Sequence, residues 1–162
     1  MNKEEILQEI EKTKKHLSNM QNMLQGYNKR WKPKYDDRYY YVSEECTATE
    51  SRAWAEYIVD ERYRRYNVFK TEEEAKQEAE KILIRRQLED IARCLNKGEE
   101  FDWSDENQLK YCIAFDFPLN IISIGALYRK LQGSVYCLSD KFKDVAVQEI
   151  AEERVKKYLR GK

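Results

Sequence analysis

Glycine, proline and histidine are scarce in this 162-residue sequence, which contains 5 Gly, 2 Pro and 1 His. The glycines are scattered, and none belongs to a GxGxxG or GxxxxGK[ST] motif, so no glycine-rich phosphate loop is predicted. His16 alone supplies neither a Cys–His nucleophile pair nor the ligand set of a zinc site. These absences argue against the common nucleotide-binding, metal-dependent and nucleophilic enzymes.

Cysteine pairs at CxxC spacing are also absent. Cys46, Cys94, Cys112 and Cys137 are widely spaced, with no secretory signal before them, and we interpret them as free thiols in a reducing compartment. Cys112 and Cys137 lie in strand-like runs, where cysteine usually behaves as a small buried hydrophobe. The sequence predicts no cofactor, no metal site and no catalytic residue, although its 30 acidic residues leave paired-carboxylate chemistry open.

Long apolar runs and an excess of charge are missing too. No run reaches the roughly 18 apolar residues of a membrane span. The 30 Lys+Arg balance the 30 Asp+Glu, which argues against a histone-like class of nucleic-acid-binding protein. Charged residues make up 37% of the chain. We expect a cytoplasmic protein with one core, much solvated helix and no membrane contact.

A heptad pattern marks the N-terminal region. Its seam positions alternate in spacing between four and three residues, and they are Ile6, Ile10, Thr13, Leu17, Met20, Leu24, Tyr27 and Trp31. This pattern predicts an N-terminal helix over residues 1–31, which either packs on the same chain or forms a homodimer with a second copy. Pro33 ends the helix, so residues 32–33 form a linker.

The next segment, residues 34–97, is predicted to be β-rich and closed by a capped helix. Residues 38–42 are aromatic and β-branched, as expected of a strand, and residues 51–66 predict one or two more strands, with a helical start at 52–57 as the alternative. Thr71 and Glu74 form a capping box, from which a helix runs to about residue 96.

The last segment, residues 98–162, repeats this plan. Strands are expected at 109–116, 121–128 and 134–137, before one helix that begins near Ser139. Aligning residues 68–72 with residues 136–140 also places apolar positions of the two helices together. The predicted fold class is α+β: an N-terminal heptad-patterned helix and two antiparallel strand-rich segments, each closed by a capped helix.

Two segments combine basic and aromatic residues. Lys and Arg contact phosphates and aromatic rings stack on unpaired bases, while Arg and Tyr are also typical of protein interfaces. The alternatives are a solvated helix end in which Trp31 completes the seam, and an edge strand protected by charge. On a strand, Arg62 and Arg64 would share one face. The candidate partner-binding residues are Lys29, Arg30, Trp31, Lys32, Lys34, Arg62, Arg64 and Arg65.

Residues 99–106 place five carboxylates beside Phe101 and Trp103. Such a segment could present a negative patch to a basic partner, for example the nucleic-acid channel of an enzyme. The alternative is a loop whose two aromatic residues anchor on the core while its acids stay hydrated.

Several aromatic and cap positions follow one order along nearly the whole chain. They are Trp31-Lys32-Pro33, Tyr39-Tyr40-Tyr41-Val42, Asn67-Val68-Phe69-Lys70-Thr71 with Ala75, Asp102-Trp103, Gln108-Leu109-Lys110-Tyr111, and Val135-Tyr136 before a helix holding Ile150. In this order the chain resembles small accessory proteins of Firmicute prophages and integrative elements. Where the usual pattern favours glycine before Asn67, this chain has Tyr66.

This resemblance implies a phage or mobile-element protein that acts in the bacterial cytoplasm. Some small proteins of these elements are anti-defence factors, including inhibitors of type II CRISPR effector nucleases. We therefore expect a non-catalytic anti-CRISPR protein that binds a host CRISPR effector or its guide-RNA complex. The alternatives are an accessory protein that contacts DNA or RNA directly, and a sponge that traps a signalling nucleotide.

Overall fold

The computed structural model describes residues 9–20 and 30–161, and it has an α+β fold with two small antiparallel sheets. Residues 9–20 are helical. The elements that follow are β1 (Arg38–Val42), β2 (Ala48–Arg52), α2 (Glu56–Arg64), α3 (Glu72–Asn96), β3 (Lys110–Asp116), β4 (Ile121–Leu127), β5 (Tyr136–Cys137), α4 (Phe142–Ile150) and α5 (Glu152–Leu159). Among the described residues, no helix is both long and apolar enough to span a bilayer.

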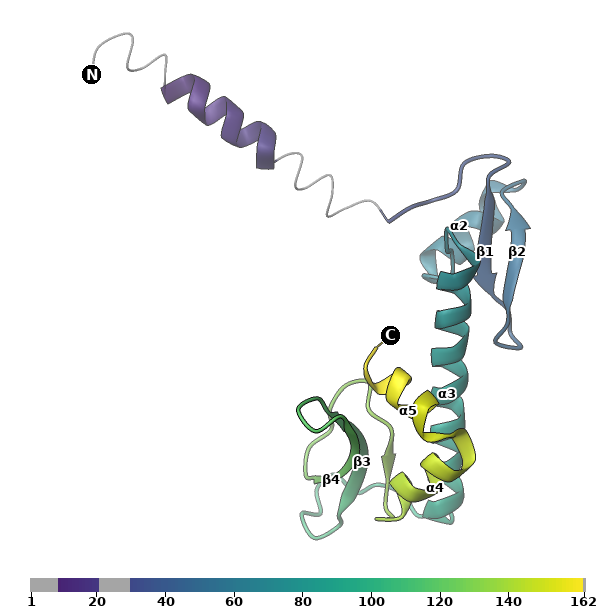
Figure 1. Cartoon of the computed structure of the whole chain (residues 1–162), viewed down its shortest axis with the longest axis vertical. Coiled ribbons are helices and arrows are strands. Elements are labelled where there is room, and N and C mark those ends of the chain that lie inside the picture. The colour runs from purple at the N-terminus through teal and green to yellow at the C-terminus, as the bar shows by residue number, and fades with distance from the viewer. Residues whose placement is uncertain (1–8, 21–29, 162) are drawn as a thin grey trace.

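Helix α3 connects two groups of elements (Figure 1). Its 25 residues extend over roughly 37 Å. Near its beginning it contacts β1 and β2, and further along it packs against β5, α4 and α5. We call β1, β2 and α2 with the start of α3 the N-terminal unit, and β3, β4, β5, α4 and α5 with the end of α3 the C-terminal unit.

The capping box predicted at the start of α3 is present. The Glu74 N–H donates to the Thr71 hydroxyl at 3.3 Å, and the Thr71 N–H donates to the Glu74 carboxylate at 3.1 Å. At the other end, Lys97 and Gly98 take positive φ angles of 52° and 87°, which stops the helix. Local chemistry therefore sets both limits of α3.

The predicted strands of residues 51–66 are largely wrong. Strand β2 ends at Arg52, and most of this segment forms α2. Val59 and Tyr63 lie four residues apart, so a helix places both on one face, where they pack with Tyr39 of β1. The helical start considered for residues 52–57 was the better alternative.

The predicted single C-terminal helix is interrupted. Ala151, with φ 81° and ψ 137°, separates α4 from α5. Ile150 and Val155 are both buried, and a continuous helix would place these positions about 140° apart around its axis. The break between α4 and α5 reorients the chain, so that the side chains of Ile150 and Val155 both enter the same core. In addition, α4 begins without a side-chain cap; the Ser139 hydroxyl accepts from the Lys141 N–H at 3.3 Å.

The two units share one strand topology. In the C-terminal unit, β3 is central, pairing antiparallel with both β4 and β5. In the N-terminal unit, β1 pairs with β2 and also with Phe69, which exchanges backbone hydrogen bonds of 2.8 and 2.9 Å with Tyr40. Phe69 thus occupies the place of Cys137 in β5, as in the sequence alignment of residues 68–72 with 136–140. Each third segment leads directly into a helix.

The two units differ in their cores. The buried core of the C-terminal unit consists of Ile84, Leu88, Ala92, Ile113, Ile122, Cys137, Phe142, Ala146, Ile150 and Val155. The N-terminal unit buries Tyr39, Ala53, Val59 and Val68, with Trp31, Tyr41 and Tyr63 packed against them. Trp31, predicted as the last seam residue, belongs instead to this core. The seam positions Ile6, Leu24 and Tyr27 lie outside the described residues.

Candidate binding surface

The two basic aromatic segments predicted from the sequence lie together on the N-terminal unit. The Tyr63 hydroxyl donates to the Arg30 carbonyl oxygen at 3.1 Å, and the Arg30 guanidinium donates to the Tyr63 carbonyl oxygen. Lys32 forms an ion pair with Asp60 of α2. Residues 30–34 are thereby attached along α2, while Lys29 lies outside the described residues. Tertiary contacts combine two segments that the sequence keeps about thirty residues apart.

Arg30 is held between two tyrosine rings. Its guanidinium carbon lies 3.8 Å from the ring centroid of Tyr63 and 4.3 Å from that of Tyr66. Within the described part of the chain, its buried Nε and Nη1 atoms have no hydrogen-bond partner. The electron-rich ring faces provide attraction in place of these bonds. Arg30 therefore joins the chain before β1 to the end of α2.

Arg62 also has a structural role. Arg62 lies in a helix rather than in the predicted strand, and its side chain turns toward β1. Its guanidinium carbon lies 3.6 Å from the Tyr41 ring centroid, and its guanidinium donates to the Tyr39 hydroxyl. Arg65 pairs with Glu61 at 2.6 Å on the exposed side of α2. Arg62 and Arg64 do not share a face, and Arg64 is exposed. Of the three arginines, Arg64 is best placed to reach a partner.

Tyr66 occupies a backbone position that favours glycine. It follows the C-cap of α2 with φ 59°, and the N–H groups of Tyr66 and Asn67 donate to the Tyr63 and Arg62 carbonyls at 3.1 and 2.9 Å. These bonds form a Schellman motif, whose left-handed residue is usually glycine. A non-glycine residue in this conformation costs about 1 kcal/mol or more. Nevertheless the side chain here is a tyrosine, 79% exposed.

Three further aromatic side chains are exposed on this unit: Tyr35, Trp54 and Tyr57, at 76%, 61% and 74%. Tyr35 and Trp54 meet edge to face with ring centroids 6.0 Å apart. Tyr57 and Arg64, seven residues apart in α2, lie on the same outer face of the helix. Sequence patterns do not single out these tyrosines and Trp54, because only the packing separates exposed aromatic residues from the core residues Tyr39 and Tyr63. The one available signal concerned Tyr66, which stands where glycine was expected.

A hollow of about 380 Å³ lies between residues 32–35 and the beginning of α2. Its lining combines basic, aromatic and small apolar residues: Lys32, Pro33, Lys34, Tyr35, Ala53, Glu56 and Val59. The contact with Asp60 holds the pKa of Lys32 above its ordinary value. Lys32 is therefore charged but already paired, whereas the structure gives the Lys34 ammonium no ion pair among the described residues.

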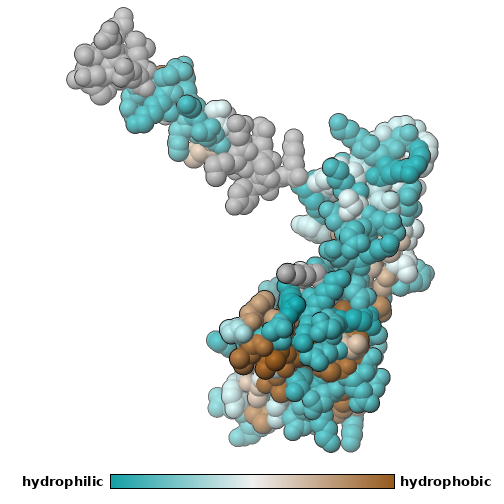
Figure 2. Space-filling model, viewed as in Figure 1, coloured by the Kyte–Doolittle hydropathy of each residue, from teal (hydrophilic) through white to brown (hydrophobic). Residues whose placement is uncertain are grey.

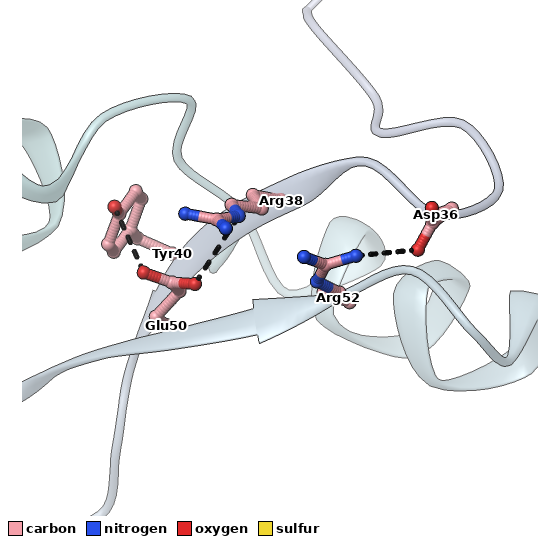
Figure 3. Close-up of polar contacts among 5 residues, drawn as sticks. All are labelled: Asp36, Arg38, Tyr40, Glu50 and Arg52. Carbon is pink, nitrogen blue, oxygen red and sulfur yellow. Dashed lines mark hydrogen bonds and ion pairs between the residues drawn. The ribbon is translucent and has the colours of Figure 1, made fainter.

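The outer polar side chains of the β1–β2 hairpin are largely paired with one another (Figure 3). Arg52 bonds Asp36 at 3.0 Å, and Glu50 lies 3.8 Å from Arg38 and 3.4 Å from the Tyr40 hydroxyl. Such exposed pairs contribute little to stability. They do, however, neutralise the two arginines of the hairpin. The candidate binding surface is therefore defined as Lys34, Tyr35, Trp54, Tyr57, Arg64 and Tyr66.

The acidic segment 99–106 is anchored as the structural alternative predicted. Phe101 and Trp103 pack on Tyr136 of β5, with ring centroids 6.4 and 5.0 Å away, while the acidic residues are exposed. Hydrogen bonds from Ser104 hold the pKa of the Asp102 carboxyl below its usual value. Beneath the loop, the buried Lys110 donates to the Asp105 carbonyl at 2.8 Å. The sequence pattern does not predict a buried lysine here, because a charged residue on a strand is ordinarily exposed.

The C-terminal unit exposes several large apolar side chains among its polar residues. Figure 2 shows hydrophobic residues gathered on this unit, whereas the visible face of the N-terminal unit is mainly hydrophilic. At the β3–β4 hairpin, Phe117, Leu119 and Ile121 are 69%, 66% and 47% exposed. The two units thus offer different surfaces to a partner.

The cysteines are free thiols, as predicted. Cys112 and Cys137 are buried, and burial raises the pKa of both thiols, so they are neutral and unreactive at ordinary pH. Cys94 is exposed and Cys46 is half-buried. Across residues 9–20 and 30–161, no cluster of His, Cys, Asp and Glu has the arrangement of a metal site.

Comparison of the chain with protein-family models, curated proteins and solved structures finds no match.

Proposed function

We propose that this protein is a non-catalytic anti-defence protein of a phage or mobile element, which inhibits a host CRISPR effector by binding the effector or its guide-RNA complex. The resemblance of the aromatic and cap positions supports the biological class. The candidate binding surface supports the mode of action, since inhibition by occlusion requires only a complementary surface with a few anchoring residues.

Tyr66 is the observation that carries this proposal. Its backbone conformation would be less costly for glycine, yet a large side chain is 79% exposed there. Stacking of the Tyr66 ring on the Arg30 guanidinium offsets part of this conformational cost. An exposed tyrosine at a position whose backbone favours glycine is well explained by contact with a partner, because tyrosine and arginine dominate the binding energy of many interfaces.

The surrounding residues fit a partner that carries negative charge. Arg64 and Tyr57 project from the same face of α2, and Lys34 lies beside Tyr35 at the hollow. Arg30, Lys32 and Arg62 are engaged within the unit and hold the surface in shape. The binding residues proposed here are therefore a revised set, in which exposed tyrosines replace the structural arginines.

The test is complex formation between the purified protein and a type II CRISPR effector, with and without guide RNA, followed by size-exclusion chromatography with light scattering. We expect co-elution that depends on the guide RNA and inhibition of target cleavage in the same samples. Absence of a complex under both conditions would contradict the proposal and direct the search to nucleic acids and signalling nucleotides.

Two variants locate the surface. Tyr66→Gly removes the side chain while favouring the backbone, so binding should weaken at least about tenfold with no loss of folding stability. Arg64→Glu should weaken binding similarly, whereas Arg93→Glu, at an exposed position of α3 in the C-terminal unit, serves as its matched control. Equal affinity of all three variants and the wild type would place the interface elsewhere.

Direct binding of nucleic acid is the second candidate function. The neighbouring rings of Tyr35 and Trp54 beside Lys34 are chemically suited to stack on a base and contact a phosphate. In that case affinity for a single-stranded oligonucleotide should fall steeply as the salt concentration rises, and Trp54→Ala should weaken binding. Affinity that is unchanged by salt, or no binding at low salt, would remove this candidate.

A further inference from the structure

The helix of residues 9–20 leaves an apolar seam without cover in the described structure. Every residue of this segment is exposed, and the apolar seam residues Ile10, Leu17 and Met20 are 45%, 50% and 46% exposed. Figure 1 shows the segment apart from both units. A helix of this length is marginal in water by itself, so its stripe of apolar residues requires a partner surface.

Heptad positions follow directly from the seam. Ile10 and Leu17 take position a, while Thr13 and Met20 take position d. Thr13 is compatible with burial because its hydroxyl already donates to the Glu9 carbonyl oxygen at 2.8 Å, which leaves its methyl group for packing. The seam therefore contains no unsatisfied polar group among the described residues.

The flanking charges indicate which way a partner helix would run. Glu9 takes position g and Lys14 takes position e of the next heptad. In a parallel two-stranded coiled coil these positions lie against each other across the seam, so Glu9 of each chain faces Lys14 of the other. In an antiparallel pair, position e faces position e, and the Lys14 side chains would be brought toward each other. The charges favour the parallel arrangement.

We propose that residues 9–20 form part of a parallel, in-register coiled coil with a second copy of this chain. Ile6 and Leu24 continue the same spacing in the sequence on either side. Two copies would then carry two candidate binding surfaces, so that a dimer could engage two sites of a partner at once. This inference is independent of the identity of that partner.

The first measurement is the mass of the full chain by light scattering over a concentration series. We expect a mass that rises toward that of two chains, and Leu17→Glu should keep the protein at the mass of one chain. The substitution Arg64→Glu, on the candidate binding surface, should leave dimerisation unchanged, so failure of the dimer and failure of the proposed function are distinguishable. A wild-type protein that has the mass of one chain at every concentration overturns the inference.

A charge exchange tests the orientation. Lys14→Glu should raise the dimer dissociation constant severalfold, because Glu9 would then face a glutamate, and Glu9→Lys combined with Lys14→Glu should restore it. Lys15→Glu is the matched control, since it makes the same change at position f, which faces solvent. Equal effects of Lys14→Glu and Lys15→Glu would overturn the parallel pairing.

Crosslinking provides an independent test of register. With Cys46 and Cys94 replaced by serine, Ile10→Cys and Leu17→Cys should each give a disulfide-linked dimer on mild oxidation. A parallel in-register pair places every seam position opposite its own copy, whereas an antiparallel pair can do so at only one position. A crosslink from only one of the two variants, or from neither, contradicts the proposal.

Discussion

The N-terminal and C-terminal units arrange three strand segments in the same order, but they are held together by different interactions. The C-terminal unit buries a largely aliphatic core between its sheet and three helices. In the N-terminal unit the core is smaller, and arginine side chains stacked on tyrosine rings connect its elements. The same topology is therefore stabilised mainly by apolar burial in the C-terminal unit. In the N-terminal unit, aromatic and cationic contacts near the surface contribute a larger share of the stability.

We expect this difference to separate stability from the proposed recognition of a partner. Apolar burial is the dominant favourable contribution to folding. The C-terminal unit has the larger buried core, so we expect it to supply more of the folding free energy. The N-terminal unit exposes Tyr35, Trp54, Tyr57 and Tyr66.

Shortening a buried side chain of the C-terminal unit should have the largest effect on stability. Phe142 is fully buried, and Phe142→Ala should lower the free energy of unfolding by about 3 to 5 kcal/mol, because the cavity adds to the lost transfer free energy. Phe117→Ala, at a 69% exposed position of the same unit, is the matched control and should lower it by only about 1 kcal/mol, through loss of the edge-to-face contact with Phe115. Urea denaturation measures both. Similar losses in the two variants would contradict the assignment of the core.

The arginine contacts of the N-terminal unit should have an intermediate effect. Arg62→Ala removes the stack on Tyr41 and the bond to the Tyr39 hydroxyl, and should lower the free energy of unfolding by about 1 to 2 kcal/mol. The same change at the exposed Arg64 should have almost no effect. Arg62→Lys should recover less than the full stability, because an ammonium group does not reproduce the planar stack. Urea denaturation compares the three variants, and equal stability of Arg62→Ala and Arg64→Ala would show that the cation–π contacts are not structural.

Glycine substitutions at positive φ should distinguish the units further. Ala151 has φ 81° at the break between α4 and α5, and its small side chain contributes little, so Ala151→Gly should raise the free energy of unfolding by about 1 kcal/mol. Tyr66→Gly should raise it by less, because the stack on Arg30 is lost. Thermal unfolding ranks the variants. A stability decrease in Ala151→Gly would contradict the backbone argument.

Alkaline pH should weaken the C-terminal unit by a smaller amount. Burial raises the pKa of the Cys112 and Cys137 thiols, so the unfolded chain loses these protons first. Stability is then retained below a pH of about 8.5, the ordinary thiol value, and declines as the pH rises toward the higher native pKa. Urea denaturation at neutral and at alkaline pH should show the decline. A double variant with alanine at both positions should show less of it, and an identical pH dependence would rule out the thiols.

Local sequence signals predicted several elements well. Residues 38–42 form β1, and the capping box at Thr71 begins α3. The strands near residues 109–116 and 121–128 are also present as β3 and β4. These predictions rest on side-chain alternation and on hydrogen bonds between near neighbours in the chain, both of which operate over a few residues.

The errors have a common physical origin. Residues 56–64 are rich in aromatic and charged residues and have no clean alternation, so their conformation depends on Val59 and Tyr63 packing against β1. The break at Ala151 likewise depends on Ile150 and Val155 reaching one core. Tertiary packing overrides weak local preference in both places. The candidate surface was predicted only in part, because a sequence does not distinguish an arginine stacked within the protein from one that faces a partner.

The sequence by itself determined the α+β class, the limits of α3 and most strands, and it predicts the heptad positions on which the proposed pairing of two copies rests. Only the tertiary structure brought residues 30–34 beside α2, placed Arg62 against β1, and left Tyr66 exposed. Caps, turns and alternation are local, so neighbouring residues determine them. Contacts between segments about thirty residues apart depend on how the whole chain closes, which no local pattern specifies.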